Sequence, residues 1–428
     1  MNYHIMRLQA QAMALPIQPK PCKEARLSCR LVAHLDNVGP HVTWLELWPR
    51  YATHYAAAAN EAVAALTKAL EYNRGQRTAA DLAVVALASH GTAIRLLQTD
   101  LKRSECQEAL DSALVCTAAL AIFQIVMNDT SKGGRANTFA HWAGMHAITQ
   151  AKQTNREESE LVRAILYSFS DGLSGLAVLR GTSLCMEEQH WADVQPASLH
   201  PVQSDVLKLR TTEYHLQLQL PRLLCETRTI REKDDITSQS LNAILEVALK
   251  LYLASEDQAE TAVLRRAAVI GAAEDSIVPF ILSFATKDDL LVALIYWHTR
   301  LVVINCCLRI VQEGHLIQGL NEARLQSDRD RTYMNVLMSW EHAASMNSFA
   351  AAIVAKGFTQ GWQHLRSCET WRGLRCGIMI DWILPRMASP SLAYLEAPEL
   401  TVAQLDLAAD MLQGRPLCDF LAADRLPI

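Results

Sequence analysis

Apolar residues recur along most of this chain at the three-to-four-residue spacing of helices that bury one face. Proline rarely interrupts the pattern, because five prolines fall between Pro16 and Pro49 and the next is Pro196. Alternating β-branched stretches bounded by Asn-Gly or Asp-Gly turns are scarce. We therefore predict an all-α protein, built as a large multi-helix domain of antiparallel helix pairs.

Stretches rich in Asn, Gly or Pro divide this pattern into separate helices. Residues 128–135, "NDTSKGGR", supply the Asn and Gly that commonly end helices. Because this connection is short, the helices on either side of it should pack antiparallel. The expected helices, with ends good to about two to four residues, are 51–71, 79–100, 105–127, 137–152, 158–180, 202–220, 236–254, 258–272, 287–312, 330–356, 371–385 and 401–412.

The distribution of prolines also suggests how the chain is organised. Residues 1–40 are expected to form a partly irregular N-terminal lead-in to a helical domain that spans 41–428. Within that domain, residues 194–204, "VQPASLHPVQS", hold two prolines and predict an internal seam.

Charge and cysteine usage narrow the class of protein. The formal net charge is −5, from 40 basic and 45 acidic residues, so the chain lacks the basic excess of a general nucleic-acid binder. The eleven cysteines are scattered and no signal peptide precedes them, which favours reduced thiols in an intracellular compartment. No uninterrupted apolar run reaches about 18 residues, so no membrane span is expected.

The familiar cofactor and metal motifs are missing from the sequence. There is no phosphate-binding GxxxxGK[ST] loop, no GxGxxG turn after a strand and no HExxH zinc helix. The acidic pairs at 234–235 and 288–289 lack a third carboxylate one turn later, as a Mg²⁺-diphosphate site would need. We expect no metal and no cofactor.

The stretch 141–146, "HWAGMH", places His141, Trp142 and His146 within six positions of one predicted helix. Trp142 and His146 lie on one helical line and His141 on the line beside it. In the simpler interpretation Trp142 anchors the core and the two histidines flank it at the surface. In the alternative these three side chains line a ligand site.

Two further aromatic–histidine pairs carry the same pair of interpretations. Trp297 and His298 are adjacent in "YWHTR", and Trp340 and His342 lie two positions apart in "SWEHAASM". Indole rings on apolar helices mostly pack in cores, whereas an aromatic pocket with a histidine can position a ligand and move a proton.

The order of these helices resembles the middle-homology domain, or fungal-specific transcription factor domain, of zinc-cluster regulators. The segments that carry the resemblance are 44–72, 92–127, 136–151, 179–191 and 293–310. They resemble, in turn, the family's opening helix, its characteristic helix pair, the helix after a Gly-containing turn, the segment ending in Trp and a late aromatic-rich helix. Aligning the third segment on His141 and Gly144 leaves Thr138 where the family has Trp.

The chain departs from that family at its N-terminus. Family members usually carry two C-x2-C-x6-C units that hold two Zn²⁺ and read DNA. Here only Cys22 and Cys29 have the x6 spacing, and no x2 pair precedes them. The resemblance therefore implies a transcription-regulatory protein or co-regulator of fungal metabolism without its own zinc cluster. It implies a nuclear location, with the cytoplasm as the alternative, and no direct binding to DNA. The partners it implies are a small-molecule effector and a protein partner or homodimer.

An enzyme remains the alternative, with a helical scaffold repurposed for a non-metal reaction. The substrate would be a natural-product intermediate, and the reaction a proton transfer or cyclisation. The catalytic candidates are then Asp171 and His190, and the ligand-binding candidates are His141, Trp142, His146, Trp191, Trp297 and His298. A third interpretation is a scaffold that binds no ligand.

Overall fold

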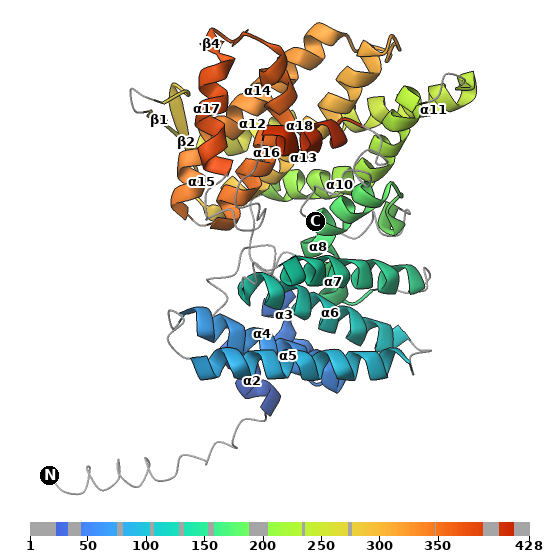
Figure 1. The fold of residues 1–428 in the computed structure, drawn as a ribbon, viewed down its shortest axis with the longest axis vertical. Coiled ribbons are helices and arrows are strands. Elements are labelled where there is room, and N and C mark those ends of the chain that lie inside the picture. Colours follow the sequence, from blue (N-terminus) through green and yellow to red (C-terminus); the bar gives the residue numbers. More distant parts are fainter. Residues whose placement is uncertain are drawn as a thin grey trace, which may run out of the picture.

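The computed structural model describes residues 23–32, 44–74, 80–102, 107–127, 132–152, 158–187, 204–232, 236–272, 276–346, 348–387 and 402–414. Helices that pack against one another make up most of these residues, and the only sheets among them are two antiparallel two-stranded hairpins. The predicted all-α fold class is confirmed. The molecule is elongated, with an N-terminal and a C-terminal half stacked along its long axis (Figure 1).

The N-terminal half is a stack of helices that follow one another along the chain (Figure 1). Its elements are α2 (Lys23–Val32), α3 (Trp44–Tyr51), α4 (Ala57–Arg74), α5 (Ala80–Leu101), α6 (Gln107–Met127), α7 (Lys132–Ala151), α8 (Glu160–Arg180) and the 3₁₀ turn η3 (Cys185–Glu187). Every residue of α6 from 112 to 124 is buried, which explains why this helix is apolar on all sides. The short 128–131 connection makes α6 and α7 antiparallel neighbours, as predicted.

The C-terminal half contains longer helices and both hairpins (Figure 1). Its elements are α10 (Ser204–Glu232), α11 (Ser238–Leu253), α12 (Asp257–Arg266), β1 (Ala268–Gly271), β2 (Phe280–Ser283), α13 (Lys287–Gln312), α14 (Glu322–Met338), α15 (Trp340–Met346), α16 (Ser348–Ser367), β3 (Thr370–Trp371), β4 (Leu374–Arg375), α17 (Cys376–Met387) and α18 (Val402–Met411). Twenty residues of α13 are buried, so this helix is the central element of the half.

Six predicted helices differ from those observed by more than four residues. The helix expected over 51–71 begins at Ala57, and the one expected over 137–152 already begins at Lys132. The helix expected over 371–385 begins at Cys376, because residues 370–375 form the hairpin of β3 and β4.

The helix expected over 258–272 ends at Arg266, and the β-branched Val269 and Ile270 enter strand β1, which pairs with β2. The helix expected over 330–356 is divided among α14, α15 and α16. The helix expected to end at 220 continues through Pro221 to Glu232, because α10 is packed against helices of both halves and tertiary burial outweighs the cost of proline.

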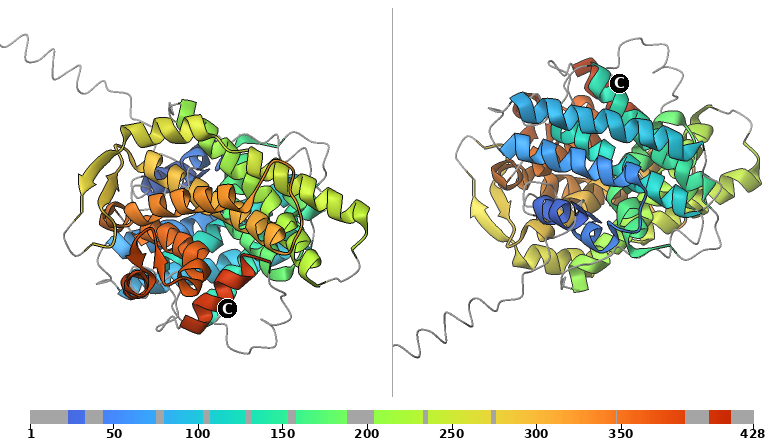
Figure 2. Two further views of the ribbon diagram at one scale, coloured as in Figure 1. Left: turned by 90° about the horizontal axis from the view of Figure 1, so that it is seen from above. Right: turned by 90° about the horizontal axis from the view of Figure 1, so that it is seen from below.

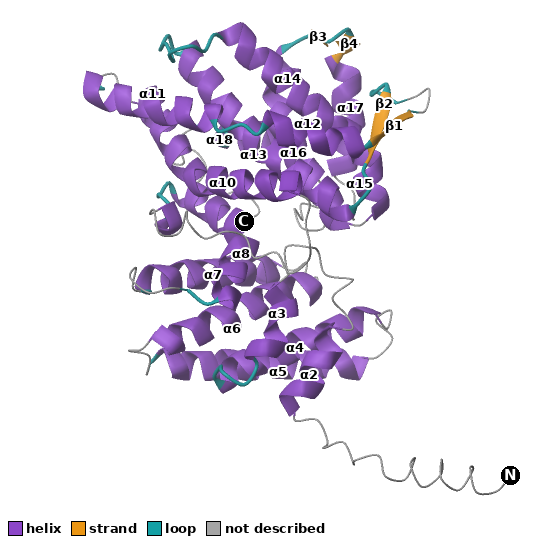
Figure 3. Ribbon diagram, turned by 180° about the vertical axis from the view of Figure 1, so that it is seen from behind, coloured by secondary structure: helices purple, strands orange, loops and turns teal. Residues whose placement is uncertain are grey.

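The two halves have separate hydrophobic cores that interlock at one place. One core joins α2–α8, and two others join the helices of the C-terminal half. Tyr214 and Leu218 of α10 belong to the N-terminal core, whereas Val178 of α8 belongs to a core of the C-terminal half. Helices α8 and α10 therefore fasten the halves together, and they lie between them in the view from behind (Figure 3). Views along the long axis show each half covering the other (Figure 2).

The predicted lead-in and seam are only partly described. Within 1–40 the structure describes α2, whose Leu31 is fully buried and whose Arg30 forms an ion pair with Glu71 of α4 at 2.6 Å. Of the predicted seam at 194–204 only Ser204, the first residue of α10, lies within the described residues.

Three of the described helices are long and apolar enough, by length and composition alone, to cross a membrane. They are Gln107–Met127, Glu160–Val178 and Lys287–Gln312. The expectation of no membrane span considered only uninterrupted apolar runs, and this criterion for a possible span was too narrow because it passes over these three helices. Most of each segment is buried inside the fold, so packing in the two halves accounts for the apolar composition. The absence of a membrane span stays a prediction.

Candidate functional site

The candidate catalytic residue Asp171 lies at the junction between the two halves. It is on α8, and its carboxylate accepts a charge-assisted hydrogen bond from Lys356 Nζ on α16, 185 positions away in sequence. The side chains are 48% exposed for Asp171 and 41% exposed for Lys356. Asp171 therefore links an N-terminal helix to a C-terminal one at the surface of the junction.

A buried carboxyl group lies deeper in the same junction. Glu213 of α10 is 3% exposed, and Tyr167 Oη donates a hydrogen bond to its Oε2 at 3.4 Å. Burial, followed by the nearby charge of Asp171, raises the pKa of Glu213 to about 8. The Glu213 carboxyl group is therefore protonated through most of the neutral range. Beside it, Ser170 Oγ donates to Gln217 Oε1 at 2.7 Å and completes the polar contact between α8 and α10.

His298 of α13 faces the same charges. Burial lowers the pKa of His298 to about 4, with Asp171 acting to raise it and Lys356 to lower it. Its Nδ1 atom is buried and has no hydrogen-bond partner among the described residues. The imidazole is therefore neutral at physiological pH.

These groups form the junction cluster, which we define as Tyr167, Asp171, Glu213, His298 and Lys356. Its members come from four helices, α8, α10, α13 and α16. Titratable groups with shifted pKa values that gather at one place are typical of functional sites, although structural ion pairs shift pKa values as well. The charge of Asp171 acts on both Glu213 and His298, and the Asp171–Lys356 pair joins the two halves.

Trp142 of α7 contacts α8 at Gly172, the position after Asp171. It is partly buried against the N-terminal core, and its indole ring occupies the space that a side chain at Gly172 would take. The Cβ of an alanine at 172 would lie 3.0 Å from Trp142 Cε2. His146, one turn farther along α7, is buried, so the expectation that both histidines lie at the surface is wrong for His146.

His141 lies in a different environment from the junction cluster. Its ring stands edge-on to that of His90 on α5, with centroids 6.2 Å apart, and His90 stacks on Phe123 at 4.5 Å. Gln124 and His90 are hydrogen-bonded at 3.1 Å. Burial, followed by the charge of His90, lowers the pKa of His141 to about 4. His141 and Trp142 are thus neighbours in sequence with separate surroundings.

Trp297 is likewise separated from His298. It is fully buried, and its Nε1 donates to Glu260 Oε1 of α12 at 2.7 Å. Arg331 of α14 pairs with the same carboxylate at 3.1 Å, and Asn335 donates to it at 3.4 Å. Because successive residues of a helix point in different directions, Trp297 faces α12 and α14 while His298 faces the junction cluster.

The remaining predicted site residues, His190 and Trp191, lie outside the described residues. Sequence reasoning missed Tyr167, which lies one turn before Asp171 on α8, and Glu213 and Lys356, which come from other helices. One signal was present for Glu213, because it interrupts the buried series Leu209, Leu216 and Leu220 at a position of the same helical face. In the described part of the chain, no group of three His, Cys, Asp or Glu side chains could hold a metal ion.

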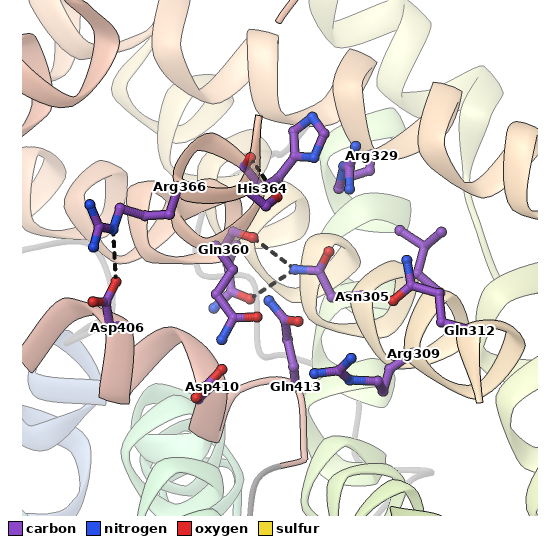
Figure 4. Close-up of a pocket in the computed structure, with 13 residues that line it drawn as sticks. Asn305, Arg309, Gln312, Arg329, Gln360, His364, Arg366, Asp406, Asp410 and Gln413 are labelled. Atoms are coloured by element: carbon purple, nitrogen blue, oxygen red, sulfur yellow. Dashed lines mark hydrogen bonds and ion pairs between the residues drawn. The ribbon is translucent and has the colours of Figure 1, made fainter. Parts of the chain in front are cut away.

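A polar cavity of about 560 Å³ lies in the C-terminal half, and the sequence did not predict it. Helices α13, α14, α16 and α18 line it with amide, guanidinium and carboxylate groups (Figure 4). The signal that the sequence offered is a row of polar residues, Asn305, Arg309 and Gln312, spaced by about one turn in the mostly apolar C-terminal part of α13.

Compared with protein-family models, with curated proteins and with solved structures, the chain matches none of them. The resemblance to the fungal transcription factor domain therefore rests on the helix order and the residues that carry it.

Proposed function

We propose that this chain is a regulatory protein, a transcriptional regulator or co-regulator of metabolism whose 428 residues hold no zinc-cluster motif. The resemblance in helix order supports this function, and the nucleus is the proposed location, with the cytoplasm as the alternative. The chain acts through a protein partner or a second copy of itself and responds to a small-molecule effector. It does not bind duplex DNA with sequence specificity, because it lacks the zinc cluster and a basic excess.

The observation that carries this proposal is the contact between Asp171 and Lys356. A catalytic carboxylate is expected to face its substrate in a cleft, with a pKa tuned by its surroundings. The Asp171 carboxylate instead holds an ammonium group of the other half at the surface of the junction. A contact of this kind couples the positions of two packed halves, which is what a sensing protein needs to pass an effector signal to a partner.

The charge pair allows an experiment that separates coupling from catalysis. In a strain lacking the gene, transcripts are compared after complementation with the wild type, Asp171→Lys, Lys356→Asp and the double exchange. Both single variants place like charges together and should alter the transcript pattern. The double exchange restores the ion pair and should restore the wild-type pattern. If Asp171 were catalytic, a carboxylate at 356 would not replace it and the double exchange would restore nothing. The proposal is therefore refuted if the double exchange fails to restore the wild-type pattern. It is also refuted if the single variants leave that pattern unchanged.

One observation favours the enzyme as a second candidate. Glu213 keeps its proton through most of the neutral range and lies beside Tyr167, so it has the state required of a general acid. In that case the substrate is a natural-product intermediate and the reaction a proton transfer or cyclisation. Glu213→Gln keeps the shape of the side chain and removes the proton donor of the carboxyl group. It should therefore abolish turnover if the chain is an enzyme, and leave the transcript pattern unchanged if it is not.

A further inference from the structure

The polar cavity of the C-terminal half is lined almost entirely by hydrogen-bonding side chains. Leu308 is the one apolar residue of its lining, which otherwise consists of Asn, Gln, Ser, His, Arg and Asp. The volume of about 560 Å³ lies within the range of small-molecule sites, which runs from about 300 to 1,000 Å³. A lining of this composition suits a polar ligand and not an apolar one.

Two buried amides in the lining of the cavity join α13 to α16. Asn305 is 5% exposed, and its Nδ2 donates to the backbone oxygen of Gln360 at 2.9 Å and to Gln360 Oε1 at 3.5 Å (Figure 4). Gln360 is 2% exposed, and its Nε2 is buried with no hydrogen-bond partner in the described part of the protein. Buried amide donors are almost always hydrogen-bonded, so this unpaired N–H group lacks an acceptor. It has almost no exposed surface, and because Gln360 lines the cavity, an acceptor there reaches it when the amide turns.

One guanidinium on the cavity wall is also open. Arg366 is engaged by Asp406 at 3.4 Å, and Arg329 by Asp330 at 2.9 Å. Arg309 lies one helical turn from Asn305 on the same face of α13. Its Nε is buried, and no side-chain partner is recorded for its guanidinium among the described residues. The open donors of the cavity therefore include one positive charge.

We propose that this cavity binds a small organic anion whose carboxylate or phosphate oxygens accept hydrogen bonds from Arg309 and Gln360. The inference deepens the proposed regulatory function, on which it rests for its biological meaning, because it names the chemical class of the effector. An oxyanion satisfies the two open donors at once and forms charge-assisted hydrogen bonds with the guanidinium. The rest of the lining includes Gln363, Ser367 and Gln413, whose amides and hydroxyl suit the hydroxyl groups of such a ligand.

The binding site lies where it can act on the arrangement of several helices. Arg309 belongs to α13, Gln360 to α16, and the acidic wall to α18. Helix α16 also carries Lys356, one turn before Gln360, and α13 carries His298 of the junction cluster. A ligand that draws Arg309 and Gln360 together therefore acts on the two helices that contribute His298 and Lys356 to the junction.

The test measures binding to the purified full chain by calorimetry, with gluconate, glucose 6-phosphate and neutral glucose as probes. These three molecules share a polyhydroxyl body and differ in the presence and kind of anionic group. We expect gluconate, glucose 6-phosphate or both to bind with a Kd of about 1 mM or tighter, and glucose to bind at least about tenfold more weakly. Which acid binds distinguishes a carboxylate ligand from a phosphate ligand.

Variants then locate the binding. Arg309→Gln and Gln360→Glu should each weaken the binding of the acid by about tenfold or more, because one removes the charge and the other replaces the open donor with an oxygen. Arg95→Gln, on exposed α5, removes the same charge far from the cavity and should leave affinity within about twofold. Arg309 is only partly buried, so its variant should fold even if the Gln360 variant does not.

The proposal is overturned if neither acid binds more tightly than glucose, or if folded Arg309→Gln binds as the wild type does. Its failure is separable from that of the regulatory function. If binding depends on Arg309 but no transcript responds, the anion site stands and the regulatory function is refuted. If transcripts respond but neither acid binds, the regulatory function stands and the anion site is refuted.

Discussion

Asp171 on α8 and Lys356 on α16 form an ion pair between the two halves of the molecule, 185 positions apart in sequence. Nearly half of each side chain is exposed, and water screens the attraction. The pair therefore contributes to the relative position of the halves and little to the stability of either.

The stability of Asp171→Asn and Lys356→Met should reflect this exposure. Each variant is expected to lower the free energy of unfolding by no more than about 1 kcal/mol, with a coupling of about 0–1 kcal/mol in the double-mutant cycle. Urea unfolding followed by circular dichroism measures these values. A coupling well above this range would show that the pair is shielded from solvent and holds the fold itself together.

Glu213 should make the protein less stable as pH rises. Its folded pKa of about 8 lies above the ordinary value of 4.5, so between these limits the folded state holds a proton that the unfolded state has lost. The free energy of unfolding therefore falls as pH rises from about 5 to about 8, by an amount on the order of a few kcal/mol.

Glu213→Gln removes this titration while it keeps the size of the side chain. The variant should show a flatter pH dependence in urea unfolding between about pH 5 and 8 than the wild type. Glu71→Gln, in an ion pair at the surface, serves as the control. Parallel pH profiles for the wild type and Glu213→Gln would mean that the carboxyl group is ionised in the folded protein.

His141 should make the protein less stable as pH falls. Its pKa is lowered from 6.5 to about 4, so below the unfolded value the unfolded state binds a proton that the folded state rejects. Stability is therefore lost as pH falls from about 6.5 towards 4. His141→Gln cannot bind this proton and should lose less stability over that window, as followed by thermal unfolding. A wild-type slope in the variant would show that His141 is accessible to water in the folded state.

The helices could be predicted far better than the site, and α13 and the junction cluster show why. The predicted range 287–312 coincides with α13, because a helix is set by local signals. Thr286 caps its first turn by accepting a hydrogen bond from the Asp289 amide, and apolar spacing continues to the end. The junction cluster instead combines α8, α10, α13 and α16, whose contacts depend on the packing of the two halves.

The same difference explains the residues that were predicted to act together but do not. Asp171 and His298 were both candidates, and the structure places the imidazole of His298 within reach of the Asp171 charge. His141 was grouped with Trp142 because they are adjacent in sequence, yet its ring lies beside that of His90 of α5. Trp297 faces Glu260 of α12. Sequence distance along one helix does not fix which neighbouring helix each side chain meets.

Close packing between α14 and α16 gives a further prediction. A Cβ at Gly361 would lie 2.2 Å from Tyr333 Cζ, and this ring is buried and donates from its hydroxyl to Phe358 O at 3.3 Å. Gly361→Ala should therefore cost about 1–3 kcal/mol of unfolding free energy or more. Gly175→Ala is the matched control, because nothing lies within 4 Å of that Cβ, and it should stabilise α8 by up to about 1 kcal/mol. Equal effects of the two changes would contradict the observed contact.

The regulatory function faces its most direct test in a measurement of turnover. Purified wild-type protein and Asp171→Asn are incubated with a metabolite extract from a strain lacking the gene, and the products are compared by mass spectrometry. Asp171→Asn should stay folded, since its side chain is largely exposed. We expect no metabolite to be converted by the wild type, together with altered transcript levels in the same strain. Conversion of an accumulated metabolite by the wild type, lost in folded Asp171→Asn, would contradict the regulatory function and establish an enzyme.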